Sequence, residues 1–377
     1  MQNVVLGLLL YRLTGSTALL GTMALASAIP QVLVSLFTGV LVDRFSKKRL
    51  MQIGQAVSTL TFLIIALSLQ TGYLSKAHAG SWWILVAMSV VQGISGALLW
   101  SARSAILAEL VNKDGVSNAT SLATIGLNIF QLIAPAFAGF LIDKVNFEAV
   151  FLTISGLYFI SVFITNFVPV KAIASFNGRN LIADMIAGLK YVRNNTALLW
   201  VLIFTLLSSM VVLPLGAMMS VFSDSILKVG ATGLGVLQGF SAAGALLTVL
   251  VIASVNFKKR GLLMLGTGLI LGLAQAAFAF STSYPLSLAI LLFVGLGTMG
   301  QVNLAMILLQ TYAEPAQRGR VLSLFLLGIG ISGLMSFCSG FIAEGIGIQW
   351  TIGGISLLLA AATILIFFLV PQLRQLD

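Results

Sequence analysis

Charged side chains are scarce in this 377-residue chain, because only 8% of its residues are Asp, Glu, Lys or Arg and 59% are hydrophobic. An average soluble domain is about 25% charged. With a mean hydropathy of +1.09, the chain cannot bury its apolar surface inside one water-exposed globule, which would still need a largely polar exterior. The composition indicates a membrane protein and excludes soluble enzymes and free nucleic-acid-binding proteins.

Cysteine and histidine are almost absent. Cys338 is the only cysteine and lies in an apolar run, so we expect no internal disulfide and no cysteine metal site. His78 is the only histidine, and we interpret it as a loop residue. Zinc catalysis and catalytic triads that need a second imidazole or thiol have almost no residues to use. We therefore expect no metal, no cofactor and no enzymatic activity.

Membrane-spanning helices can be read as the gaps between charges, because about twenty apolar residues cross the hydrocarbon layer. The charge-free windows are 13–42, 50–75, 77–102, 115–142, 149–170, 194–223, 229–257, 261–313, 321–343 and 345–373. The window 261–313 is long enough for two helices, and the hydroxyls and proline of 281–285 favour a turn within it. The chain therefore predicts eleven full spans.

A short apolar segment precedes these spans. Val4 to Tyr11 extends only about 12 Å at 1.5 Å per residue, which is too short to cross. We interpret it as the end of a further helix, inside which the chain begins. The prediction is an all-α membrane protein with eleven complete transmembrane helices and a partial first one.

The basic residues predict the orientation, because they concentrate in the cytoplasmic loops of membrane proteins. If the loop that contains Arg44 and Lys47 is cytoplasmic, most of the 20 basic residues lie on that side. The exceptions are Arg12, Lys76, Lys144 and Lys228. We predict a multi-pass protein of the cell (plasma or inner) membrane with a cytoplasmic C-terminus. This bias also accounts for the net charge of +10 without a nucleic-acid partner.

The longest polar connection divides the chain into two halves. We predict an N-terminal helix bundle at 1–169, a cytoplasmic linker at 170–196 and a C-terminal bundle at 197–377. Within the linker, Leu181 to Asn194 places apolar residues at helical spacing. This amphipathic stretch is expected to lie on the membrane surface and to connect the halves.

The end of the second predicted helix carries an informative loop. Its pattern, given by Gly39, Asp43, Arg44, Lys47 and Lys48, resembles the G-x-x-x-D-R-x-G-R-K loop of the major facilitator superfamily, with a serine in place of the second glycine. The resemblance implies two six-helix bundles that rock around a central site, and a cytoplasmic gate formed by this loop.

Asp43 itself needs a compensating partner, because a carboxylate at the C-terminal end of its own helix is disfavoured by the helix dipole. Arg103 and the start of the eleventh helix, counted with the partial first one and preceded by Arg318 and Arg320, are the candidate partners. We therefore add these three arginines to the predicted gate.

Further segments resemble the branch of the superfamily that includes macrolide and enterobactin exporters. These are Ala102 to Asn118, Gly188 to Leu199 and Leu309 to Val321. The antiporter motif of helix five, G-x8-G-x3-G-P-x2-G-G, is matched in part, with Phe130 departing from it. Its matching residues are Ala134, Pro135, Ala138 and Gly139. Small residues at these positions allow close helix contact, and ordinary packing is the alternative reading.

The predicted spans contain uncharged amides and no acidic residue at mid-membrane. The candidates for a substrate path are Gln92, Asn128, Gln131, Gln301 and Asn303. Amides tolerate neutral or varied substrates, although each could instead form a hydrogen bond between helices. The family's proton-coupling acid is often in helix one, so we expect it to be missing from view here.

These observations predict a secondary active transporter that exports a hydrophobic or amphipathic small molecule, similar to a drug or macrolide, in exchange for protons. No nucleotide-binding P-loop pattern occurs, so proton coupling is the default expectation. One rival is a metabolite or siderophore carrier. A rival of another class is a receptor or lipid scramblase built on the same bundles. Substrate identity and oligomeric state are left open.

Overall fold

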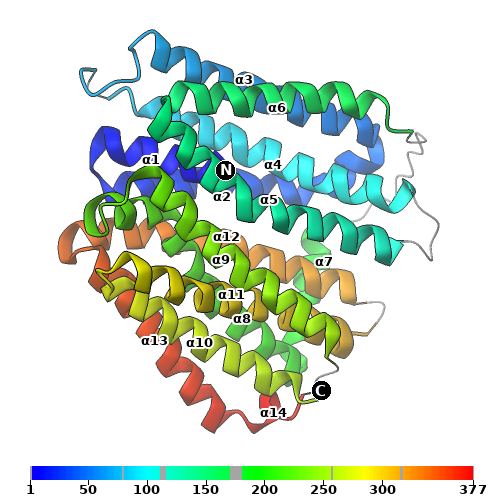
Figure 1. Ribbon diagram of the computed structural model, residues 1–377. Helices are drawn as coiled ribbons and strands as arrows, with labels where there is room; N and C mark the ends of the chain where they lie inside the picture. Colours follow the sequence, from blue (N-terminus) through cyan, green and yellow to red (C-terminus); the bar gives the residue numbers. More distant parts are fainter. Residues whose placement is uncertain are drawn as a thin grey trace.

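The computed structural model describes residues 2–78, 80–110, 116–169, 181–255, 258–314 and 317–376. Long helices that run roughly parallel make up this part of the chain (Figure 1). The helices of the first half are α1 (Gln2–Thr14), α2 (Thr17–Arg44), α3 (Lys47–Gln70), α4 (Trp83–Leu110), α5 (Val116–Lys144) and α6 (Phe147–Asn166). Those that follow are α7 (Leu181–Asn194), α8 (Thr196–Val221), α9 (Gly230–Ser254), α10 (Arg260–Phe280), α11 (Tyr284–Tyr312), α12 (Arg318–Ile346), α13 (Ile348–Leu369) and α14 (Pro371–Arg374).

The helices have the lengths that a membrane requires. Ten of them are long and apolar enough to cross a bilayer within the described residues, and α12 spans 29 residues, of which Gly330–Ile346 form a shorter apolar stretch. The eleven expected spans thus correspond to α2 to α6 and α8 to α13. The predicted turn is also confirmed, because α10 ends at Phe280 and α11 begins at Tyr284.

Local sequence signals explain several helix boundaries. The Asn146 side chain accepts a hydrogen bond from the Ala149 N–H at 2.8 Å and so caps α6, and Asn195 caps α8 in the same way. After α8 the chain continues into a π-helical turn, η2 (Phe222–Ile226). Such turns are frequent at functional sites, and this one carries Asp224.

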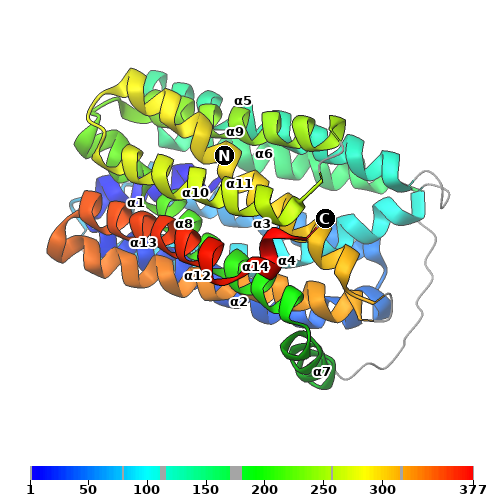
Figure 2. The ribbon, with the colours of Figure 1, turned by 90° about the horizontal axis from the view of Figure 1, so that it is seen from below.

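The helices form two bundles that meet along two seams. In the first bundle α3 packs on α4 and α6, and in the second α10 packs on α11 and α13 (Figure 1). The bundles touch where α5 packs on α9 and where α2 packs on α12. The amphipathic segment is helical as α7, which lies at the margin of the bundles and packs on α8 and α12 (Figure 2). The first part of the predicted linker, 170–180, lies outside the described residues.

Candidate functional site

The helix-five motif lies on the seam between α5 and α9. A Cβ atom at Gly139 would be 2.1 Å from the Ala231 carbonyl oxygen, and one at Gly235 would be 2.3 Å from the Pro135 carbonyl oxygen. No Cβ atom fits at such a distance, so both positions need glycine for the helices to approach. Small residues therefore set the spacing of the two bundles here.

The seam between α2 and α12 is built in the same way. A Cβ atom at Gly21 would be 2.7 Å from the Ser336 carbonyl oxygen, and one at Gly340 would be 2.6 Å from the Thr17 carbonyl oxygen. The Thr17 hydroxyl also donates to the Gly340 carbonyl at 2.9 Å. Backbone meets backbone on both seams, which makes the fit between the bundles sensitive to a single added methyl group.

One end of the molecule carries polar contacts between the bundles, and we call it the interlocked end (left in Figure 1). The guanidinium of Arg12 donates to Asp224 through Nε at 2.7 Å and through Nη2 at 3.2 Å. Next to this pair, the Tyr11 hydroxyl lies 2.6 Å from the Ser225 hydroxyl. Two further carboxylates, Asp143 and Glu344, also bridge the bundles at this end. The contacts join α1 to η2, α5 to α9 and α12 to α2, so they hold this end shut.

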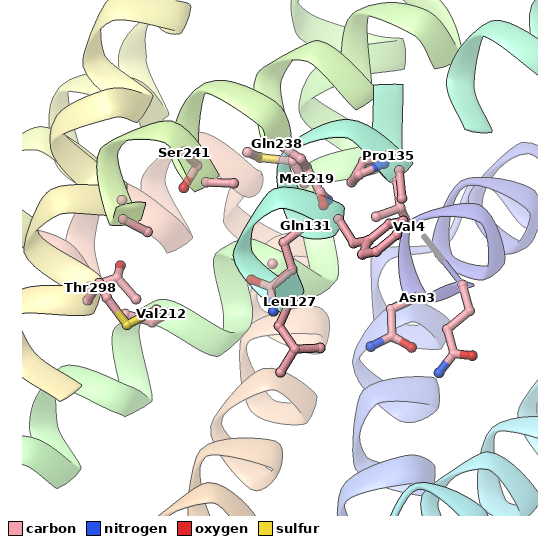
Figure 3. A pocket seen from close by; sticks show the side chains of 18 of the residues that line it. Asn3, Val4, Leu127, Gln131, Pro135, Val212, Met219, Gln238, Ser241 and Thr298 are labelled. Carbon is pink, nitrogen blue, oxygen red and sulfur yellow. The ribbon is translucent and has the colours of Figure 1, made fainter. Parts of the chain in front are cut away.

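A cavity of about 1020 Å³ lies between the bundles. Residues of α1, α5, α6, α8, α9, α10 and α11 form its wall (Figure 3). Its polar lining includes Tyr158, Gln131, Gln238, Ser241, Gln275 and Thr298. Most of the remaining lining is apolar, including Met219 and Met299, whose flexible side chains adapt to ligands of varied shape.

The cavity wall is uncharged. Among the described lining residues there is no Asp, Glu, Lys, Arg or His, and Tyr158 alone has an ionisable side chain. A permanent charge on a ligand would therefore find no counter-charge there, and desolvating it would be costly. The wall suits a neutral molecule of about the size of a drug, held by apolar contact and a few hydrogen bonds.

Gln275 offers a specific hydrogen-bonding group in this wall. Its side chain is fully buried, and Nε2 donates to the Val211 carbonyl at 2.8 Å. The amide oxygen has no partner in the structure. A buried acceptor without a donor is unfavourable, so a hydroxyl or N–H of a bound molecule would stabilise this oxygen once the wall rearranges to admit it.

The structure brings one of the five predicted path residues to the cavity. Gln131 lines it from α5 (Figure 3). Gln92 instead accepts hydrogen bonds from Ser58 and Ser95, both at 3.4 Å, inside the first bundle. These contacts match the alternative reading of an amide that joins helices.

The other three amides also lie away from the cavity lining. Gln301 accepts from the Ser208 hydroxyl at 3.3 Å and donates to the Met264 carbonyl, both within the second bundle. Asn128 is buried, and its Nδ2 has no partner, as is also the case for the Nδ2 of Asn303. The rotation of each helix, which the amide pattern leaves open, decides these placements.

The lysines of the predicted gate bind within the first bundle. Lys47 forms an ion pair with Glu109, and Lys48 donates to the Asn166 carbonyl at 2.5 Å. These contacts tie the start of α3 to α4 and to the end of α6. Gly39, Asp43 and Arg44 belong to the last turns of α2, but their side chains lie outside the described part of the structure.

The other three arginines of the predicted gate lie on two helices. Arg103 is half-buried on α4. Arg318 and Arg320 occupy the first turn of α12, where Arg318 donates to the Ala313 carbonyl at 3.3 Å and Arg320 to the Gln317 side chain at 2.9 Å. These contacts connect the first turn of α12 to the residues just before it. The gate assignment stays a prediction.

Several residues at the interface and in the cavity were not selected from the sequence. Gln238 and Gln275 are intramembrane amides like the five that were chosen, so composition gave no reason to prefer them. Arg12, Asp143 and Glu344 were counted only as charges near loops. One signal was present: Asp143 and Glu344 each follow a glycine by four residues, as Asp43 does.

Two helical bundles around an uncharged central cavity define a membrane carrier. Residues 1–336 match the family described as Major Facilitator Superfamily, and the chain belongs to this superfamily. It is a multi-pass secondary transporter of small molecules and not an enzyme.

The chain is similar to known relatives in sequence and to solved structures in fold. The Staphyloferrin A transporter of Staphylococcus aureus (strain NCTC 8325 / PS 47) is 22% identical over 94% of this chain and 88% of its own length. The multidrug efflux pump Tap of Mycolicibacterium fortuitum is 22% identical over 96% of this chain and 90% of its own. A solved structure of the peptide transporter POT superimposes with a TM-score of 0.76 at 14% identity, covering 100% of this chain and 92% of that one. This last likeness concerns the fold alone.

Proposed function

We propose that this transporter exports a neutral, hydrophobic or amphipathic small molecule, similar to a drug or macrolide, in exchange for protons by alternating access. The uncharged cavity of about 1020 Å³ is the observation that carries the proposal. Its methionines and amides suit substrates of varied shape, and a rearrangement of the wall would let the Gln275 oxygen accept from a substrate hydroxyl or N–H group. The similarity to an efflux pump gives further support.

The proposal includes an orientation. The bias of basic residues supports a cytoplasmic location for the C-terminus and for the loops at its end of the molecule. The interlocked end then faces outward, and the cavity would load from the cytoplasm while that end is shut. A green fluorescent protein fused to the C-terminus tests the orientation. It would fluoresce if that end is cytoplasmic, and fluorescence only after fusion to an interlocked-end loop would overturn the assignment.

Two rivals lead to different experiments. A metabolite or siderophore carrier is supported by the similarity to the Staphyloferrin A transporter, and it predicts saturable transport of one polar compound with indifference to drugs. A receptor or lipid scramblase on the same fold predicts no gradient-dependent solute flux in proteoliposomes.

The decisive test measures the accumulation of fluorescent dyes and macrolides in pump-deficient cells that express the chain, with and without a protonophore. We expect reduced accumulation that the protonophore reverses. Unchanged accumulation of every compound, despite membrane insertion, would contradict the export of such molecules.

A cavity variant links the transport to this site. Gly216 lines the cavity and has open space where a Cβ atom would be placed, so Gly216→Leu narrows the cavity without a backbone clash. We expect export of the bulkiest compounds to fall more than that of small dyes. Gly266→Leu is the matched control, because Gly266 on α10 also faces open space but is not part of the lining. Equal effects of the two variants on export would show that transport does not depend on this cavity.

A further inference from the structure

A glycine followed four residues later by an acid ends three of the long helices. The pairs are Gly39 with Asp43 on α2, Gly139 with Asp143 on α5, and Gly340 with Glu344 on α12. Residues four apart lie on the same face of a helix, one turn from each other. Each acid also lies at the C-terminal end of its own helix, where the dipole disfavours a negative charge. Their recurrence at such positions calls for a partner outside the helix.

On α5 the structure shows that partner. Gly139 lets α5 approach the Ala231 carbonyl, since a Cβ atom would be 2.1 Å from it. One turn further, Asp143 accepts hydrogen bonds from the Thr232 N–H at 2.8 Å and the Ala231 N–H at 3.4 Å. These N–H groups belong to the first turn of α9, which has no helical acceptor for them. Asp143 therefore caps a helix of the other bundle.

On α12 the same arrangement is repeated in the reverse direction. Gly340 lies against the Thr17 carbonyl at the start of α2. Glu344 accepts a hydrogen bond from the Ala18 N–H at 3.2 Å and another from the Ser16 hydroxyl. The second bundle thus caps a helix of the first, as the first caps a helix of the second.

Such a cap acts only while the bundles are together. When they separate, each carboxylate keeps its unfavourable position at its own helix end and loses the positive end of the partner helix. The exposed first turn of α2 or α9 loses its acceptor at the same time. The stabilisation of both acids therefore depends on the conformation of the transporter.

We propose that Asp143 and Glu344 are positioning residues of the transport cycle, each forming a latch that holds the interlocked end closed. This inference rests on the proposed function in one respect: the latches open and close only if the protein goes through a transport cycle. Asp43 carries the same pattern at the opposite end of the molecule, on a helix that packs on α12. The sequence pattern of the latch thus recurs at the opposite end, whereas the contacts that define a latch are described for Asp143 and Glu344.

The test measures the accessibility of the cavity from each face of the membrane, and it needs no substrate. Cys338 is replaced by Ser to remove the only cysteine, and Thr298→Cys places a reporter in the cavity wall. An impermeant maleimide is then added to either face of membrane vesicles. The readout is the ratio of labelling rates from the interlocked face and from the opposite face. A merely structural role would lower the yield of folded protein without changing this ratio.

We expect Asp143→Ala and Glu344→Ala each to raise the ratio by about threefold and the double variant by about tenfold, as the loss of one or two dipole contacts implies. Glu148→Ala is the matched control, because Glu148 is an acid at the same end but lies in the first turn of its own helix, α6. An unchanged ratio in the double variant, or an equal change in the control, would overturn the proposal.

A second pair of variants covers the case in which an alanine variant does not yield monodisperse protein. Asp143→Asn and Glu344→Gln keep an oxygen that can accept from the partner N–H but remove the charge. They should shift the ratio in the same direction by a smaller factor, and no shift would overturn the latches. Labelling needs no substrate. If the chain exports nothing but its variants show these shifts, the proposed function is wrong and the latches are supported.

Discussion

The two ends of this transporter hold their charges in different ways. At the interlocked end, Arg12 binds Asp224 in the other bundle, and two carboxylates cap helices of the other bundle. At the opposite end, Lys47 and Lys48 bind acceptors within their own bundle. Contacts of the first kind depend on how the bundles are placed, whereas contacts of the second kind keep one bundle intact while it moves.

This difference separates the residues that set the conformation from those that shape a bundle. An ion pair across the bundles must break each time the transporter opens on that side. An ion pair within a bundle can persist through the whole cycle. Variants at the two ends should therefore differ in how accessible the cavity is from each face of the membrane. This should hold even where the lost interactions are chemically alike.

The largest expected effect comes from the seam between α5 and α9. Gly139→Ala places a Cβ atom 2.1 Å from the Ala231 carbonyl oxygen, so this seam can no longer close. Overpacking of about 1–3 kcal/mol corresponds to about a tenfold loss of export rate, measured as dye efflux. Gly126→Ala on the same helix is the control, since its Cβ atom meets open space. Equal efflux from both variants would show that the seam need not close tightly.

The Arg12 to Asp224 pair should give the next largest effect. Its side chains are 33% and 19% exposed, so water screens the pair only in part. Arg12→Ala should favour opening of the interlocked end by about fivefold, or about 1 kcal/mol, in the cysteine-labelling ratio. The exchange Arg12→Asp with Asp224→Arg should restore part of the loss. A double-mutant cycle without coupling would argue against the pair as a closing contact.

Asp43→Ala tests the opposite end. If Asp43 closes that end as Asp143 closes the interlocked one, its loss should lower export by about threefold and shift the labelling ratio in the opposite sense. Membrane insertion should be unaffected, as judged by the amount of protein in the membrane fraction. Full transport in this variant would show that Asp43 is not part of the gate.

The smallest effect is expected for the ion pair within the first bundle. Lys47→Ala and Glu109→Ala each remove a pair that joins α3 to α4. The two side chains are 17% and 28% exposed, so this pair is no better screened by water than the Arg12 pair. We nevertheless expect the labelling ratio to change by less than about twofold, because both bundle conformations retain a pair within one bundle. A change in the labelling ratio as large as that of Arg12→Ala would show that the charged contacts at the two ends do not differ in this way.

The helices were predictable because hydrocarbon excludes charge. The gaps between charged residues gave the eleven spans, and the amphipathic spacing of Leu181–Asn194 gave α7. The small residues around Pro135 predicted close helix contact, and they lie on the α5 to α9 seam. These features follow from chain composition and from periodicity along single helices, so no knowledge of neighbouring helices was needed.

The cavity could not be predicted in the same way. Gln131 and Gln301 are alike in the sequence, yet one lines the cavity and the other joins helices of the second bundle. A helix that is apolar all round carries little information about its own rotation. The choice between such amides therefore requires the packed arrangement.

The sequence by itself determined that this protein crosses a membrane and which segments are apolar enough to span it, because this depends on the solvent that each segment tolerates. Only the tertiary structure decided which residues face the cavity and which acids close the interlocked end. Asp143 and Asp224 each lie at a helix end near a loop, and what distinguishes them is the partner that the packing of distant helices places beside them.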